Sequence, residues 1–405
     1  MTARRLTNEE TLWAQRNMTV CFGGSFDENQ SRTALQDPSR PAPDPTYGAF
    51  VDGMQTPAAT LIVNPYRVRF DGHAANMGGI GGVATLPPFR HMGLVRAIMS
   101  ESHREMHAGG TPFAALHPFA RGFYKQFGYA PGAPLHVWTL PHADLSRIPD
   151  QGGSVTQLFP GDSLEPLLCV YEKAMENVNL SSIRESFDPE LEKSAFLNEG
   201  RSIFVWWENE QPCGFLIGHM VDRVMHCESG FSHKGMCLYT SPRALLALLH
   251  FFHTAFLSHA SALCLTLPAE MDLYSFLPGG FSTGSLSTEC AHVHNGMIRV
   301  VHAENALQLA RCQGNGSLCV EVDDALIPEN SGRFLITFRQ GADNQVSRTD
   351  REPDLTITPG ALAQLLCGIK TPLDFPFMEG VCVHRPDAPF SALFYPKACR
   401  FWDLF

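Results

Sequence analysis

The residues best placed to do chemistry lie in residues 78–99, GGIGGVATLPPFRHMGLVRAIM. Four of the first five are glycines, which suits a strand with a bulge or a close backbone approach. Two prolines follow, and apolar residues at helical spacing then predict a helix over residues 90–110, with Arg90 and Gly93 in its first turn. A helix N-terminus offers unpaired N–H groups and a positive dipole end, so the segment predicts a phosphate site. A strand–helix turn without a ligand is the alternative.

A second unusual segment is residues 401–405, FWDLF, at the end of the sequence. The last residues of a domain are commonly polar and poorly ordered. Here three aromatic residues and a leucine surround a single acid, Asp403. We therefore expect this tail to be buried in the core.

Two stretches of this sequence, VATLPPFRHMGLVRAIM and AALHPFARGFYKQFGY, resemble the acetyl-CoA segment of GNAT-type N-acetyltransferases. The family pattern Arg/Gln-x-x-Gly-x-Gly/Ala falls on Arg90, Gly93 and Val95, with valine in place of the small last residue. Over nearly the whole length the chain is similar to the enhanced intracellular survival (Eis) family. The segments MIRVVHAENAL, SLCVEVDDALIPENSGRF and DLTITPGALAQLL resemble that family's sterol-carrier-like domain.

The resemblance implies a role for each matched position. Tyr124 would be the general acid that protonates the coenzyme A thiolate, and the terminal carboxylate of Phe405 the general base. Burial among aromatic rings would raise the pKa of such a carboxylate and make it a better base. Asp403 remains a competing base. The residues that would hold acetyl-CoA, the co-substrate, are Val83, Ala84, Thr85, Arg90, His91, Met92, Gly93, Leu94, Val95, Arg96, Phe119 and Ala120; a substrate pocket would begin at Phe26, Asp27 and Glu28.

The fold class expected is α/β with mixed sheets, in three units. Two tandem GNAT-type domains would occupy residues 1–148 and 149–288, and a sterol-carrier-protein-like α/β domain residues 289–405. In this division LHVWTL belongs to the first unit and MIRVV opens the third. The second unit, with helix, hairpin, helix and strand in that order, resembles a degenerate copy of the first. The first 35 residues are expected to be helical, followed by a proline-rich loop.

Composition excludes several classes of protein. The net charge of -11 argues against nucleic acid, whose phosphates require a basic face. Twelve cysteines without a CxxC pair are typical of reduced thiols in a cytoplasmic protein, so we expect neither disulfides nor a metal site. The most apolar stretch, residues 244–267, is interrupted by three histidines, which favours a helix and a strand over a membrane span. The N-terminus lacks the apolar run of a signal peptide.

These features together predict an acetyl-CoA-dependent N-acetyltransferase that transfers acetyl directly to a primary amine in a ternary complex. By resemblance the acceptor would be an aminoglycoside, a polyamine or a lysine side chain, and the protein would assemble as a homohexamer. Two alternatives remain: a hydrophobic-ligand or lipid-binding protein that uses the sterol-carrier-like domain, and a non-catalytic scaffold.

Overall fold

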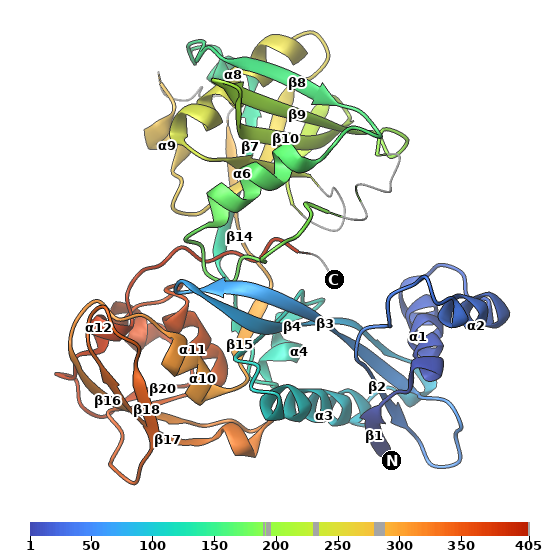
Figure 1. Cartoon of the computed structure of the whole chain (residues 1–405), viewed down its shortest axis with the longest axis vertical. Coiled ribbons are helices and arrows are strands. Elements are labelled where there is room, and N and C mark those ends of the chain that lie inside the picture. The colour runs from blue at the N-terminus through green and yellow to red at the C-terminus, as the bar shows by residue number, and fades with distance from the viewer. Residues whose placement is uncertain (189–190, 192–195, 230–234, 279–287, 404–405) are drawn as a thin grey trace.

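The computed structural model describes residues 1–188, 191, 196–229, 235–278 and 288–403 (Figure 1). Its strands form three separate sheets. In Figure 1 the second sheet lies above the other two, and the last described residues, which end at Asp403, cross the junction between them.

The first sheet is mostly antiparallel, with one parallel pair, β4–β5. The first residues form a strand, which corrects the expectation of helix from the start. The strands, in sheet order, are β1 (Thr2–Arg5), β2 (Thr46–Phe50), β3 (Ala59–Phe70), β4 (His73–Thr85), β5 (Phe113–Leu116), β15 (Met297–Val300) and β6 (Ala130–Pro131).

Helices cover both faces of this sheet. Successive strand residues point to opposite faces of a sheet. The neighbouring residues Ile62 and Val63 of β3 therefore mark the two faces of the first sheet. A side chain built at Gly82 would meet Ile62 and Met18 of α1 (Leu12–Phe22), whereas one built at Gly78 would meet Val63 and Met106 of α3 (Leu94–Ala108). Hence α1 and α3 lie on opposite faces. The remaining elements of this region are η1 (Asn8–Thr11), α2 (Glu28–Gln36), η2 (Pro87–Phe89) and α4 (Arg121–Lys125).

The second sheet repeats this plan. Its fourth and fifth strands, β11 and β13, are again the parallel pair, and α6 (Glu165–Met175) and α8 (Pro242–Phe256) pack into separate cores with it. This supports the interpretation as a second copy of the first unit. The strands, in order, are β8 (Ser154–Leu158), β9 (Arg201–Glu208), β10 (Gln211–Val221), β11 (Val224–Cys227), β13 (Ala262–Pro268), β7 (Pro134–Pro141) and β14 (Glu289–His294), with β12 (Met236–Tyr239) also paired to β10; short helices are α5 (His142–Leu145) and α9 (Leu273–Phe276).

Residues 244–267 contain most of α8 followed by β13, as the sequence predicts. The hairpin β9–β10 is also confirmed, with Asn209 and Glu210 at positive φ in its turn. Among the described residues, no helix has the length and apolarity that a bilayer crossing requires.

The two sheets are joined by one antiparallel ribbon. Strands β6 and β7 are nearly continuous, as are β14 and β15, and the gap between them is bridged by Gly132 N–H to Gly296 O (3.0 Å) and Asn295 N–H to Ala133 O (2.8 Å). The residues that form each sheet therefore differ from the domain boundaries expected from the sequence. LHVWTL lies in the second sheet, and MIRVV lies in the first. The local sequence pattern could not predict this exchange of strands, because each of the two strands pairs in a different sheet from the residues next to it in the sequence.

The third unit packs directly on the first sheet. Helix α11 (Pro359–Leu366) is buried throughout, and Gln364 Nε2 donates to Pro131 O of β6 at 2.9 Å. Its strands, in sheet order, are β18 (Gln345–Arg348), β17 (Gly332–Phe338), β16 (Gly316–Val322), β19 (Leu355–Ile357) and β20 (Val381–Val383); the other elements are α10 (Ala303–Leu309), η3 (Pro328–Asn330), η4 (Pro372–Phe377) and α12 (Phe390–Leu393).

A fully buried ion pair joins the first and third units. The Arg299 guanidinium of β15 contacts the Asp324 carboxylate, and both side chains are almost completely excluded from solvent. Asn330 and two backbone N–H groups also donate to Asp324, so its oxygens are satisfied. Because removal of one member would leave the other charge buried and unpaired, this pair holds the two units in a fixed relation.

Candidate active site

The glycine-rich part of β4 contains the bulge that the sequence predicts. The β3–β4 register shifts between Thr60 and Ile62, where β4 uses one residue more than its partner. Gly82 occupies this stretch with a φ of +57°, which suits glycine best. Strand β5 pairs β4 only as far as Ile80, so the last residues of β4 keep one backbone edge without a strand partner. Such an edge can bind an extended ligand.

The N-terminus of α3 is left open by the chain. Gly93 is its N-cap residue, with a φ of +77°, and no side chain caps the helix. A side chain built at Gly93 would meet nothing within 4 Å. His91 also has a positive φ, +65°, which is uncommon for a residue with a side chain. No side-chain cap and no neighbour of Gly93 therefore blocks an anion from the start of α3, as an anion site requires. The helix begins at Leu94 rather than residue 90, so Arg90 to Gly93 form a loop before it.

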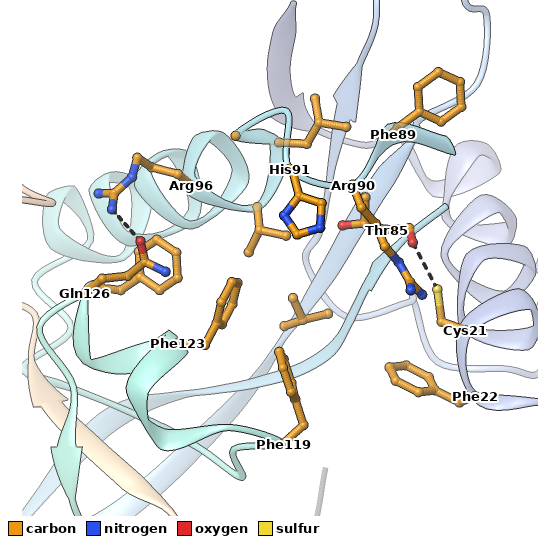
Figure 2. A pocket seen from close by; sticks show the side chains of 15 residues that line it. Cys21, Phe22, Thr85, Phe89, Arg90, His91, Arg96, Phe119, Phe123 and Gln126 are labelled. Carbon is orange, nitrogen blue, oxygen red and sulfur yellow. Dashed lines mark hydrogen bonds between the residues drawn. The ribbon is translucent and has the colours of Figure 1, made fainter. Parts of the chain in front are cut away.

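A cavity of about 760 Å³ lies beside this open helix end (Figure 2). Arg90 and Arg96 supply the cationic groups there, and both are exposed. The expected acetyl-CoA residues that line the cavity are Val83, Thr85, Arg90, His91, Gly93, Leu94, Val95, Arg96 and Phe119. Ala84, Met92 and Ala120 lie outside the lining: Ala84 is buried, whereas Met92 and Ala120 are exposed.

Aromatic rings form much of the remaining wall. Figure 2 shows Phe119 below His91, and the Arg90 side chain extended towards Cys21 and Phe22. Phe119 is 72% exposed and Phe22 66% exposed, unusually open for large apolar side chains. A ligand with an apolar arm and an anionic end would cover these rings and neutralise the arginines. The residues present thus fit coenzyme A, with its pantetheine arm and pyrophosphate.

Six lining residues were not expected from the sequence: Cys21, Phe22, Phe89, Phe123, Gln126 and Phe127. Cys21 and Phe22 come from the end of α1, and the Cys21 thiol donates to Thr85 O at 3.3 Å. Gln126 Oε1 accepts from Arg96 Nη2 at 2.7 Å, a contact drawn in Figure 2. Gln126 and Phe127 lie in the same FYKQF stretch as Tyr124. This motif could have identified both as lining residues. No motif indicated α1, because its approach depends on tertiary packing.

Tyr124 is buried directly behind the cavity wall. Its ring centroid lies 5.5 Å from that of Phe119 and 5.1 Å from that of Phe123, both cavity residues. Burial raises the pKa of Tyr124 to about 12, so its phenol stays protonated at neutral pH. A protonated phenol beside a thioester site can act as a proton donor.

The tail approaches the same region, and its first two residues, Phe401 and Trp402, are buried as expected. Phe401 is 4% exposed and Trp402 5% exposed. The backbone carbonyl of Asp403 accepts a hydrogen bond from His117 Nε2 at 2.9 Å, and burial lowers the pKa of His117, so its imidazole is neutral. His117 is only two residues from Phe119, which contacts Tyr124. Leu404 and Phe405 lie outside the described residues.

The Asp403 carboxylate is engaged on both oxygens. Oδ1 accepts from Arg184 Nη2 at 2.6 Å, and Oδ2 accepts from Ser182 Oγ at 2.5 Å. The side chains of Arg184 and Asp403 are 13% and 18% exposed, respectively. Asp403 is therefore better suited to anchor the tail than to act as a base.

The expected substrate residues have ordinary structural partners. Asp27 caps α2 by accepting from Gln30 N–H at 2.8 Å. Glu28 pairs with Arg32 one turn along the helix at 2.7 Å. Phe26 is half-buried and packs against Trp13, with ring centroids 6.4 Å apart. None of the three lines the 760 Å³ cavity.

Comparisons with known proteins agree with this arrangement. A family model for the acetyltransferase (GNAT) domain matches residues 2–132, and one for the sterol carrier protein domain matches residues 303–397. N-acetyltransferase Eis from Mycobacterium tuberculosis and from Mycobacterium bovis is 35% identical over 106 residues, or 25% of this chain. The chain spans about a quarter of the length of these curated relatives, because the matched region covers 26% of them. It thus carries an Eis-like GNAT acetyltransferase domain and a sterol carrier protein domain.

Solved structures match over the whole chain. A probable N-acyltransferase from Enterococcus faecalis has a TM-score of 0.83 at 20% identity, with 100% of both chains covered. Eis1 from Mycobacterium abscessus has a TM-score of 0.76 at 18% identity, again with 100% of both chains covered. At these identities the likeness concerns the fold, and it includes all three units.

Proposed function

We propose that this Eis-like GNAT chain is an acetyl-CoA-dependent N-acetyltransferase that acts on primary amines. The open N-terminus of α3 beside an arginine-bearing, aromatic-lined cavity carries the proposal. Acetyl-CoA supplies an acetyl group activated as a thioester. Arg90 and Arg96, together with the first N–H groups of α3, would bind its pyrophosphate. The free edge of β4 near Val83 and Thr85 would bind the amide groups of the pantetheine arm.

Tyr124 is proposed as the general acid. A departing thiolate takes a proton, and the buried, protonated phenol of Tyr124 lies behind the wall formed by Phe119 and Phe123. Because the matched position in FYKQF and the burial point to the same residue, the role does not rest on resemblance alone.

The general base is proposed to be the carboxylate of Phe405, the last residue of the sequence. An amine must lose a proton on acylation, and only its neutral form attacks a thioester. Asp403 has both oxygens occupied by Arg184 and Ser182, which favours the terminal group over this competitor. Asp403 O accepts a hydrogen bond from His117, and His117 is two residues from Phe119, which contacts Tyr124.

The experiment for the function is coenzyme A release from acetyl-CoA, measured with aminoglycosides, polyamines and lysine peptides as acceptors. We expect release that depends on at least one class of amine and a product acetylated on nitrogen. Release at the same rate without any amine would refute the proposal. The name of the Eis relatives supports N-acetyl transfer, and the panel identifies the acceptor.

A separate pair of variants tests the base. One glycine added after Phe405 moves the terminal carboxylate and leaves Asp403 in place, so we expect a fall in kcat of at least a hundredfold. Asp403→Asn keeps the terminal carboxylate and removes the charge paired with Arg184, so a smaller loss is expected. Full activity in the extended protein would exclude the terminal carboxylate as the base.

The alternative of a lipid-binding protein receives little support. The third unit shares one core with the first sheet, in which Leu318, Phe334, Leu362 and Phe394 are almost completely buried. Side chains thus fill the interior that a lipid would need. Lipid extracted from the purified protein, with no coenzyme A release in any assay, would favour the alternative.

A further inference from the structure

Three potential metal ligands meet on the parallel strand pair of the second sheet. His226 of β11, Glu228 directly after it and Cys264 of β13 have ligand atoms that all lie within 4.8 Å of one another. His226 and Cys264 are register partners across the two strands, and Glu228 is two residues beyond His226. Because residues in register, or two apart, point to the same face, the backbone itself brings the three side chains together.

The corresponding place in the first sheet is built from small residues. Both parallel pairs contain four register positions, and the third is Gly79–Ala115 in β4–β5 but His226–Cys264 in β11–β13. The residue after each fourth position is Gly81 in the first sheet and Glu228 in the second. The second sheet has therefore three donor side chains where the first has two glycines and an alanine, so the shared fold does not require them.

The three side chains are close but not enclosed. His226 Nδ1 lies 2.8 Å from Glu228 Oε1, and their side chains are 19% and 13% exposed. Cys264 is 7% exposed, and Thr139 Oγ1 donates to its sulfur at 3.8 Å. His219 of β10 lies alongside, with its ring centroid 5.7 Å from that of His226. An ion could thus enter from the exposed side of His226 and Glu228.

We propose that His226, Glu228 and Cys264 bind one Zn²⁺ ion. Imidazole, carboxylate and thiolate are all ligands that zinc takes in proteins. Tetrahedral zinc places its ligand atoms roughly 3.4–3.8 Å apart, so small side-chain rotations from the observed positions suffice. The fourth position is left for water or for His219. Zinc would replace the Cys264 thiol proton, so that binding releases a proton to solvent.

The expected effect is structural, because the ligands join two neighbouring strands of the second sheet. Zinc bound only to the folded chain would raise its melting temperature. The cysteine pattern did not predict the site, since Cys264 has no second cysteine near it in the sequence and 35 residues lie between Glu228 and Cys264. This inference is independent of the proposed acetyl transfer.

The test uses the full chain, stripped of metal by a chelator and titrated with Zn²⁺ against a colorimetric competitor. We expect one ion per chain and a higher melting temperature. Cobalt in place of zinc should give the near-ultraviolet absorption of a thiolate–cobalt bond. The Cys264→Ser variant should lose the cobalt band and the thermal shift, and Glu228→Gln should weaken binding at least tenfold.

The matched control is Cys290→Ser, an exposed cysteine of β14 in the same sheet. It should bind zinc as the unmodified protein does. If Cys264→Ser fails to fold, the Glu228→Gln result decides, because Glu228 is a partly exposed residue outside the strands. Absence of saturable binding, or zinc affinity in Glu228→Gln and Cys264→Ser equal to that of the unmodified protein, would overturn the proposal and leave a cluster joined by hydrogen bonds alone.

Discussion

The first and second sheets share a topology but differ at the helix that precedes their fifth strand. In the first sheet this helix is α3, whose N-cap Gly93 has a φ of +77° and provides no side-chain cap. In the second it is α8, whose N-cap Ser241 accepts a hydrogen bond from Ala244 N–H at 3.2 Å. Both helices contain 15 residues. One helix end is therefore open, and the other is closed by the protein's own hydroxyl.

This difference indicates how the same fold unit can bind a ligand in one place and have only a structural role in another. A helix N-terminus needs acceptors for its free N–H groups. Where a serine supplies an acceptor, as Ser241 does for α8, a free N–H group of the helix is hydrogen-bonded without a ligand. Where a glycine leaves the end open beside two arginines and a cavity, an external anion can supply it. Substitutions in the two units test whether this contrast governs function.

Tyr124→Phe should have the largest effect. Loss of a general acid costs about a hundredfold or more in rate, so kcat should fall by that factor while the Kd for acetyl-CoA stays within about twofold. The matched control is Tyr239→Phe in β12 of the second sheet, which should keep full activity. A fall in acetyl-CoA affinity as large as the fall in kcat would contradict the proton-donor role.

The pH dependence gives a second view of Tyr124. An unperturbed phenol has a pKa of about 10, whereas burial raises the pKa of Tyr124 to about 12. Because the acid must be protonated, activity is lost as pH rises through its pKa. We expect kcat to remain level through pH 10 in assays of the folded enzyme. A decline centred near pH 10 that Tyr124→Phe abolishes would show an unperturbed phenol instead.

Arg90→Gln should weaken acetyl-CoA binding by about tenfold, because a hydrogen bond to a charged group contributes roughly 1.5–3 kcal/mol. The control is Arg243→Gln in the first turn of α8, where Arg243 pairs with Glu208. Calorimetric titration should find unchanged affinity in that control. Equal losses in both variants would indicate that general charge, rather than the open end of α3, governs binding.

Gly93→Ala should weaken acetyl-CoA binding severalfold and lower the free energy of unfolding by about 1 kcal/mol, because left-handed backbone is costly for residues with a Cβ. Gly152→Ala in the second unit is matched, since Gly152 has a φ of +70°. It should lose similar stability in thermal unfolding and keep its affinity for acetyl-CoA. The prediction fails if the two variants bind acetyl-CoA equally well.

Ser241→Ala should have the smallest effect. Loss of a side-chain N-cap costs about 1 kcal/mol of stability, so the melting temperature should fall by a few degrees with no change in activity. The experiment is thermal unfolding alongside the coenzyme A assay. An unchanged melting temperature would mean that the Ser241 hydroxyl does not stabilise α8.

Much of the fold could be predicted from the sequence where signals are local. The β4 bulge followed from consecutive glycines, and the β9–β10 hairpin from two apolar runs around a polar turn. Helix α8 and strand β13 followed from an apolar stretch that three histidines interrupt. The exchange of β7 and β15 between sheets could not be predicted, because pairing partners more than 100 residues apart leave no local pattern.

The candidate site divides in the same way. Arg90, Gly93 and Tyr124 belong to short motifs, whereas Cys21 and Phe22 join the cavity only through packing of α1. The role of Asp403 was left open by sequence because its partners, Arg184 and Ser182, lie more than 200 residues away. Phe405 lies outside the described residues, so its role stays a prediction.

The most direct test of the contrast between the two sheets is a calorimetric titration of the whole chain with acetyl-CoA. If the open end of α3 binds the ligand and the capped end of α8 does not, one molecule should bind per chain. Its affinity should fall in Arg90→Gln and be unchanged in Ser241→Ala. Two molecules per chain, or an affinity that Arg90→Gln leaves unchanged, would contradict the account.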